Sequence, residues 1–172
     1  MSDMKAPTYA LVFTYKSPIF GKGFIADVQI CGRLLAEIEA ESVWLYGVNP
    51  GGFAVTAPTL AEAGVAVTTE LSTLLVDFVE EIPTFEGFRA QVQRFFDETD
   101  TETVHEWEGA VEAVRKGLLP VPPGLAVQSA NPDFRITVTS RTMTQVTPND
   151  NASAIAEQRR QQPPPIALAR AA

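Results

Sequence analysis

The sequence predicts an α+β domain in which one long helix packs across an antiparallel meander sheet and short inserted helices are added. Segments in which apolar and polar residues alternate occur before residue 58 and again over residues 133–142. A long segment with helical periodicity begins at Thr59, and shorter helical patterns follow between residues 83 and 122. A meander, a helix that covers it and a returning strand favour a two-layer architecture around one core.

The first predicted strands lie near the N-terminus. Residues 8–16 are rich in aromatic and β-branched types, which favour a strand. Residues 24–31 alternate between apolar and polar side chains, Gly32 permits a tight turn, and residues 34–41 continue the alternation. We therefore expect a hairpin that turns at Gly32, with one buried face and one solvated face.

A further strand is predicted to begin at Val43. It is interrupted by Asn-Pro-Gly-Gly at residues 49–52 and is expected to resume over residues 53–57, before Pro58 ends it. The interruption does not lead directly into a helix N-terminus, as a phosphate-binding glycine loop would. We therefore interpret it as a turn.

The long helix is predicted from its cap and its apolar stripe. Thr59 and Glu62 form a capping box, in which the Thr59 hydroxyl accepts from a backbone N–H and Glu62 reaches back to the N–H of the cap. The helix is expected to run to Glu81, because Pro83 cannot continue it. The stripe expected to face the sheet comprises Leu60, Ala63, Val67, Leu71, Leu74 and Phe78.

Residues 83–122 are predicted to form a helical insertion. A second helix is expected over residues 84–98, and a third begins at a capping box of Thr103 and Glu106 and ends near Gly117. This region holds more aromatic side chains than short helices can bury alone, so they must pack on the sheet or across a dimer interface. The sequence therefore predicts homo-oligomerisation. The aromatic residues are Phe85, Phe88, Phe95, Phe96 and Trp107.

Residues 1–147 are predicted to form a single domain, and residues 148–172 a disordered tail. The tail has no periodicity and contains Gln-Gln-Pro-Pro-Pro, a composition typical of disorder. The chain has no apolar run of about 18 residues, so we expect no membrane-spanning segment. Its N-terminus lacks the apolar stretch of a signal peptide, and we expect a cytoplasmic protein.

Charge is unevenly distributed along the chain. The formal net charge is −8; residues 151–172 contribute +2, from three arginines and one glutamate, which leaves −10 for residues 1–150. An acidic body repels phosphate backbones, so we expect no direct binding to nucleic acid. A basic protein partner is favoured electrostatically, although solubility alone is a sufficient explanation of the acidity.

The sequence contains little that indicates catalysis, and we expect neither an enzyme nor a cofactor. His105, the only histidine, falls in a predicted first helical turn and is interpreted as a surface residue. Cys31, the only cysteine, excludes an intrachain disulfide and is interpreted as a small structural residue.

Four carboxylates on the predicted hairpin have two interpretations. Asp27, Glu37, Glu39 and Glu41 could gather on one sheet face and bind a divalent cation, as in a metal-dependent hydrolase. Alternating glutamates are also the usual means by which an exposed sheet face stays solvated. We favour the solvated face and expect no metal site.

Trp44 and Tyr46 are the candidate partner-binding residues. They share one face of their strand, opposite Leu45. If Leu45 faces the core, the two aromatic side chains stand toward solvent or a partner, as interface anchors typically do. If the inserted helices cover them, they belong to the core. The sequence leaves these two alternatives open.

Three short motifs resemble the body of the HicB-like antitoxins. They are Gly-Arg-Leu-Leu-Ala-Glu-Ile-Glu-Ala-Glu at residues 32–41, Tyr46-Gly47, and Ala-Pro-Thr-Leu-Ala-Glu-Ala at residues 57–63. The resemblance covers roughly residues 9–81, with residues 133–142 matching the closing strand. It implies a partial ribonuclease-H-like or double-stranded-RNA-binding-like fold without the nuclease or RNA-binding function. It also implies oligomerisation and, in complete systems, neutralisation of a small RNA-cleaving toxin by covering its active site.

Two features depart from that family. Such antitoxins usually carry a helix-turn-helix or ribbon-helix-helix domain, and residues 143–172 contain no pattern for one. The loop at residues 49–53 and the insertion at residues 83–122 are also longer than the family pattern.

The sequence thus predicts a non-enzymatic, homo-oligomeric interaction module that binds and occludes a basic protein, in the manner of a HicB-type antitoxin. Two alternatives stay open: an orphan structural protein whose partner is itself, and a metal-dependent hydrolase built on the carboxylate-bearing sheet face.

Overall fold

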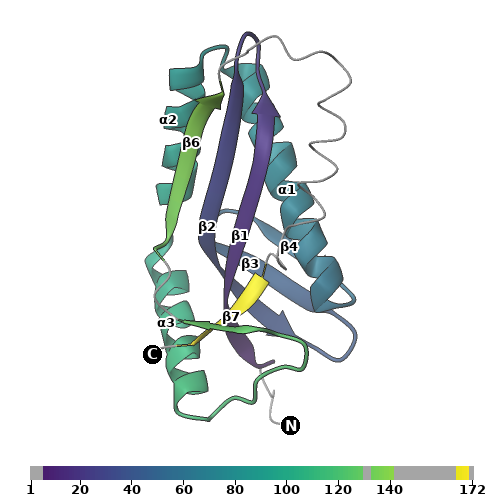
Figure 1. The fold of residues 1–172 in the computed structure, drawn as a ribbon. Coiled ribbons are helices and arrows are strands. Elements are labelled where there is room, and N and C mark those ends of the chain that lie inside the picture. Colours follow the sequence, from purple (N-terminus) through teal and green to yellow (C-terminus); the bar gives the residue numbers. More distant parts are fainter. Residues whose placement is uncertain (1–5, 130–132, 142–165, 171–172) are drawn as a thin grey trace.

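Four strands and one long helix in the first half of the chain form the frame of the molecule (Figure 1). The computed structural model describes residues 6–129, 133–141 and 166–170. The frame comprises β1 (Thr8–Phe20), β2 (Ile25–Ile38), β3 (Val43–Asn49), β4 (Ala54–Ala57) and α1 (Leu60–Glu81). These strands pair antiparallel and α1 packs on them, which confirms the predicted α+β class.

The remaining elements complete the sheet and cover it. They are α2 (Phe85–Asp97), α3 (Thr101–Arg115), β5 (Val127–Ser129), β6 (Arg135–Arg141) and β7 (Ile166–Arg170). The strand order is β4-β3-β2-β1-β7-β5, and β6 lies beside β2. The strands expected near residues 53–57 and 133–142 are β4 and β6. No helix among the described residues has the length and apolar character needed to cross a membrane.

Strand β2 is the centre of the sheet. Along one edge it pairs with β1 over Ile25–Glu37. Along its other edge it pairs first with β6, over Ile25–Cys31, and then with β3, over Arg33–Ile38. The register of β3 shifts where it meets Arg33, so Val48 is an extra residue that has no partner in β2. The long β1–β2 hairpin therefore has β6 beside one of its ends and β3 beside the other.

The predicted turn at Gly32 is wrong. Gly32 lies within β2, and the hairpin turns between β1 and β2, where the Gly21 N–H donates to the Phe24 carbonyl at 2.9 Å. The glycine is required by close packing: a Cβ at residue 32 would lie 2.1 Å from the Asn49 carbonyl oxygen and 2.6 Å from the Phe13 ring. A glycine inside a strand can therefore mark a close approach of two segments without any reversal of the chain.

Helix α1 covers one face of the sheet, as predicted. Its N-cap is Thr59, whose hydroxyl oxygen accepts from the Glu62 N–H at 3.3 Å, while the Glu62 carboxylate accepts from the Thr59 hydroxyl rather than from the backbone of the cap. Of the predicted stripe, Leu60, Leu74 and Phe78 are only half-buried, although Leu60 and Phe78 still pack against the core. The buried positions are Ala63, Gly64, Val67, Leu71, Leu75 and Val79.

Helices α2 and α3 cover different parts of the sheet. α2 lies beside α1 and β6, so its Phe88 and Phe96 join the core beneath α1 (Figure 1). α3 packs on the opposite face, where Trp107 is buried against β1, and locally adds a third layer. The predicted capping box at Thr103 is wrong: the N-cap is Asp100, whose carboxylate accepts from the Thr103 N–H at 3.0 Å.

The aromatic residues of the insertion find partners within the chain. Phe88, Phe96 and Trp107 are buried, while Phe85 and Phe95 make edge-to-face contacts with the rings of Phe24 and Phe78. Packing on the sheet, the first of the two arrangements expected for these side chains, therefore accounts for them. They supply no support for a dimer interface.

The predicted disordered tail contains a strand. Ile166–Arg170 forms β7, which pairs antiparallel with Leu11–Phe13 of β1 and parallel with β5. Ile166 and Ala169 are buried on opposite faces of the sheet, so this short Ile-Ala-Leu-Ala segment extends both cores. The other residues of the tail lie outside the described part of the chain.

Candidate functional site

Among the described residues, the sheet face opposite α1, here called the α3 face, is covered by a helix at one end. Small and branched side chains of β1, β2 and β3 form that end, and α3 packs on them through Trp107, Ala110 and Val111. The indole Nε1 of Trp107 donates to the Leu11 carbonyl oxygen at 3.1 Å, which fixes α3 to the middle of the sheet. α3 stops short of β4, and the space between them is open.

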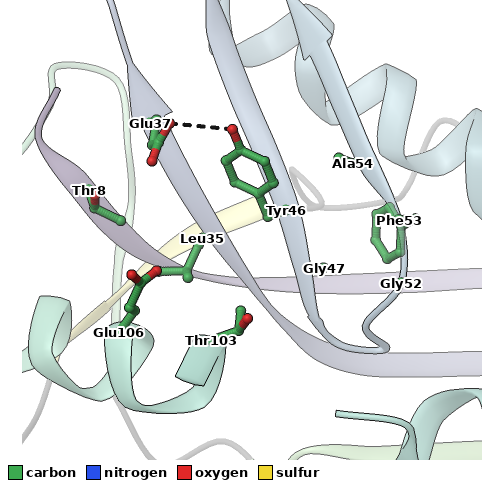
Figure 2. A pocket seen from close by; sticks show the side chains of 10 residues that line it. All are labelled: Thr8, Leu35, Glu37, Tyr46, Gly47, Gly52, Phe53, Ala54, Thr103 and Glu106. Carbon is green, nitrogen blue, oxygen red and sulfur yellow. Dashed lines mark hydrogen bonds between the residues drawn. The ribbon is translucent and has the colours of Figure 1, made fainter. Parts of the chain in front are cut away.

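This space is a cavity of about 460 Å³ between α3 and the β3–β4 end of the sheet, here called the α3 groove (Figure 2). Figure 2 shows Glu37 and Tyr46 on the sheet, Thr103 and Glu106 on α3, and Phe53 and Ala54 at the far wall. The lining residues are Thr8, Leu35, Glu37, Tyr46, Gly47, Gly52, Phe53, Ala54, Thr103 and Glu106. Among these described residues, Glu37 and Glu106 carry carboxylates.

The predicted partner-binding residues border this groove. Leu45 is fully buried toward α1, so Trp44 and Tyr46 face the other way, as the first of the two alternatives requires. Their rings are stacked, with centroids 6.3 Å apart and planes inclined by 11°. Trp44 is 38% exposed, and Tyr46 lines the groove. α3 therefore leaves this aromatic pair accessible.

Tyr46 is hydrogen-bonded to an acid in the groove. Its hydroxyl donates to the Glu37 carboxylate at 3.3 Å. Partial burial raises the pKa of Tyr46, and the negative charge of Glu37 and the hydrogen bond to it raise this pKa further. The phenol is therefore a neutral donor at physiological pH, and it aligns the Glu37 carboxylate at the edge of the groove.

A second hollow, of about 390 Å³, continues the groove past the N-terminus of α3. It shares Gly47, Gly52 and Thr103 with the groove and adds the acidic residues Glu98 and Asp100. Hydrogen bonds from Thr103 lower the pKa of Asp100, so this cap remains ionised. The helix terminus is consequently occupied by its own carboxylate and presents no anion site.

Arg33 connects the end of β3 to α3 and to the segment before β6, and the sequence analysis assigned it no such role. Its Nε donates to the Asn49 amide oxygen at 2.6 Å, and the Asn49 amide donates to the Phe96 carbonyl at 3.4 Å. Its guanidinium lies 5.1 Å from the ring centroids of both Trp107 and Phe134. Desolvation lowers the pKa of Arg33, and the charge of Glu108 opposes that effect. The arginine thus holds the β3–β4 connection against α2 and α3.

The four carboxylates considered as a metal site do not come together. Asp27 pairs with Arg141, at 2.6 and 3.0 Å, at one end of β2. Glu37 lies at the other end, and Glu39 accepts from the Ser42 hydroxyl at 3.1 Å. Within the described residues, no three His, Cys, Asp or Glu side chains are grouped as metal ligands.

The only histidine and the only cysteine have unremarkable surroundings. His105 is exposed on α3, with its Nδ1 atom 3.7 Å from the Glu108 carboxylate. Cys31 is half-buried on the α3 face, and burial raises the pKa of its thiol, an effect that nearby Arg135 opposes. Neither residue adjoins a nucleophile–base pair in the described structure.

Comparison of the chain with models of protein families, with curated proteins and with solved structures finds no match. The HicB-like resemblance therefore stays a prediction from the sequence.

Proposed function

We propose that the chain is a non-enzymatic interaction module that binds a basic protein through Trp44, Tyr46 and the α3 groove. The observation that supports this most directly is an accessible stacked aromatic pair, Trp44 and Tyr46, beside a groove whose described lining includes apolar side chains. Aromatic residues supply most of the binding energy at many protein interfaces, and charge complementarity speeds and orients the encounter.

In the form implied by the HicB-like resemblance, the partner is a small, basic, RNA-cleaving toxin in the cytoplasm. This chain would cover the active site of the toxin and make or break no covalent bond. The net charge of −10 over residues 1–150 favours such a partner, since it attracts a basic protein and repels competing nucleic acid.

The test is affinity capture on three immobilised baits: the unaltered chain, Trp44→Ser and Phe20→Ser. Phe20 is a matched control, because it is 54% exposed and lies on β1 at the far end of the sheet. We expect a basic protein on the unaltered and Phe20→Ser baits, and at least a tenfold loss on Trp44→Ser. Equal recovery on all three baits would contradict the proposal.

Self-association is a second candidate function. The aromatic residues that led us to expect it pack within the chain, so they no longer indicate a dimer interface. Sedimentation at tens of micromolar distinguishes the alternatives: a homo-oligomer without a heterologous partner favours an orphan structural protein, and a monomer excludes one.

A further inference from the structure

We propose that the outer face of α1 packs against the same face of a second copy of this chain, in an antiparallel pair with two-fold symmetry. α1 and α3 lie on opposite faces of the sheet, so this contact is independent of the proposed binding of a basic protein. Three observations support it: exposed apolar side chains, hydroxyl groups that are already bonded, and a residue order that is the same from either end. The face, here called the α1 ridge, comprises Val65, Thr68, Thr69, Ser72, Thr73 and Val76.

The α1 ridge exposes apolar surface where a solvated helix usually carries charge. Val65 is 67% exposed and Val76 is 44% exposed. The three threonines between them are exposed, and the serine is half-buried. Valine and threonine have lower helix propensity than alanine, glutamate or lysine, so the stability of α1 alone does not favour them at exposed positions. A packed contact is the environment that suits these side chains.

The hydroxyl groups of the ridge can be buried at low cost, because each already donates a hydrogen bond inside α1. Each donates to the carbonyl oxygen four residues before it, at 2.8 to 3.2 Å. The single hydroxyl proton of Ser72 is used in this way, so Tyr15 is the donor in the 3.0 Å bond that joins their two hydroxyls. A buried donor without a partner is costly, and a second helix on the ridge would leave none of these hydroxyls in that state.

The order of residues along the ridge is the same from either end. Val65, Thr69, Ser72 and Val76 are spaced by four, three and four residues, which is the spacing of a seam between two packed helices.

A two-fold axis between residues 70 and 71 brings similar side chains of two antiparallel copies together. Val65 then lies beside Val76 of the second copy, and the hydroxyl-bearing residues at 68 and 69 lie beside those at 73 and 72. A two-fold interface requires one surface to complement itself in this way. The antiparallel direction also places the N-terminus of each α1 near the C-terminus of the other, which the helix dipoles favour.

Acidic residues border the ridge at both ends. Glu62 precedes it and Glu80 follows it, and both are exposed. In the antiparallel pair, Glu62 of one copy comes near Glu80 of the other, so like charges oppose association. Salt screens exposed charges, and we therefore expect the dimer to strengthen as ionic strength rises. A complex between the acidic chain and a basic partner would show the opposite dependence.

The first experiment is sedimentation velocity of the full chain from tens to hundreds of micromolar, at low and at high salt. We expect a reversible equilibrium between monomer and dimer, with an association constant that rises with salt. A monomer at every concentration in both salts would overturn the proposal. An association constant that falls with salt would also overturn it, because the contact would then be ionic.

Val76→Glu and Val121→Glu are a matched pair of variants. The two valines are 44% and 46% exposed, each substitution adds one negative charge, and Val121 lies outside α1. Val76→Glu places a charge in the interface twice, once from each copy, so we expect it to weaken the dimer by at least about tenfold. Val121→Glu should weaken it by less than about threefold, since a distant exposed charge is screened. Equal losses would refute a contact at the ridge.

A charge pair tests the direction of packing. Val65→Glu alone should weaken the dimer as Val76→Glu does. Val65→Glu combined with Val76→Arg in one chain should restore most of the association, because antiparallel packing places each new acid beside the new base of the other copy. Both positions are exposed, so neither substitution should unfold the monomer. A parallel pair would bring like charges together, and an absence of recovery would overturn the antiparallel arrangement.

Trp44→Ser separates dimerisation from the capture of a basic protein. Trp44 lies on the sheet face opposite α1, so this variant should lose the captured protein and keep the dimer. If the dimer is lost with Trp44→Ser, the contact lies on the α3 face and the α1 ridge is refuted. If the dimer forms as expected and no basic protein is captured, the α1 ridge stands and the proposed function fails.

Discussion

The α3 face carries two hollows with different linings. The described lining of the α3 groove includes the carboxylates of Glu37 and Glu106. At the other end of the same face, a hollow of about 350 Å³ is lined by Lys16, Arg141 and Asp27, and Arg141 is already paired with Asp27. The two hollows therefore differ in their charged groups, although both belong to a chain whose formal net charge is −8.

The difference between the ends follows from which residues β1 and β2 present to this face. Under α3 they present Ala10, Val12 and Leu35, which are buried. Beyond α3 they present Thr14 and Gln29, which are exposed. In the described part of the chain, α3 covers the end of this face where the sheet presents apolar side chains, and no described helix covers the polar end. The groove forms at the edge of the covered end, where α3 stops before it reaches β4.

The largest expected effect tests whether α3 stabilises the covered end. Trp107→Ala removes a buried indole and leaves the Leu11 carbonyl without its donor, so we expect a loss of roughly 3–5 kcal/mol in the free energy of unfolding. Phe20→Ala, on the same face beyond α3, should change it by less than about 0.5 kcal/mol. Urea unfolding measures both. Similar values for the two variants would mean that α3 adds little to the stability of the sheet.

A smaller loss in the free energy of unfolding is expected at Gly32, which lies in β2 between the covered and the polar ends of the α3 face. Gly32→Ala places a methyl group against the Asn49 carbonyl and the Phe13 ring, and we expect a loss of about 1–3 kcal/mol. Gly109→Ala is the matched control: beyond the neighbouring backbone of α3, no atom lies within 4 Å of its added Cβ, and it should stabilise α3 by about 0.4–1 kcal/mol. Thermal unfolding of both variants tests the sign of each change. A tolerated alanine at residue 32 would show that the β3–β4 connection is free to move.

Local sequence patterns predicted the elements more reliably than their contacts. The periodicity and cap at Thr59 predicted α1, and the alternation around Leu45 correctly placed Trp44 and Tyr46 together on one face. Gly32 was misread because a glycine between alternating segments is compatible with both a turn and a close approach. Only the position of Asn49, which is distant in sequence, distinguishes the two.

The groove itself could not be predicted from one sequence. Its walls come from segments about 60 residues apart, Tyr46 on β3 and Glu106 on α3, and no local pattern connects them. Arg33 was equally hidden, since its partners Trp107 and Phe134 follow it by about 70 and 100 residues. β7 was missed because its apolar segment follows a proline-rich composition, and its pairing with β1 is visible only in the folded chain.

A third prediction uses the alkaline titration of Tyr46 to probe the groove. Its pKa lies above the ordinary value of 10.0, so the folded chain keeps this proton at a pH where the unfolded chain has lost it. The contribution to stability is complete below about pH 10 and falls as the pH rises through the folded pKa. We expect Tyr46→Phe to show a flatter decline in stability as the pH rises above about 10. Identical declines would mean that Glu37 does not interact with the phenol in solution.

The smallest effect concerns Cys31, which lies on the α3 face between the two hollows and pairs in register with Thr14 and Arg135. Burial raises the pKa of its thiol, and the opposing charge of Arg135 has the smaller influence, so little thiolate is present at neutral pH. Alkylation by iodoacetamide at pH 7.5 should therefore be several-fold slower in the folded chain than in urea, and its rate should rise with pH. A folded-state rate above the rate in urea would instead indicate a thiolate stabilised by Arg135. In that case the positive charge of Arg135 would control the reactivity of Cys31. The difference between the two hollows would then extend to the thiol that lies between them.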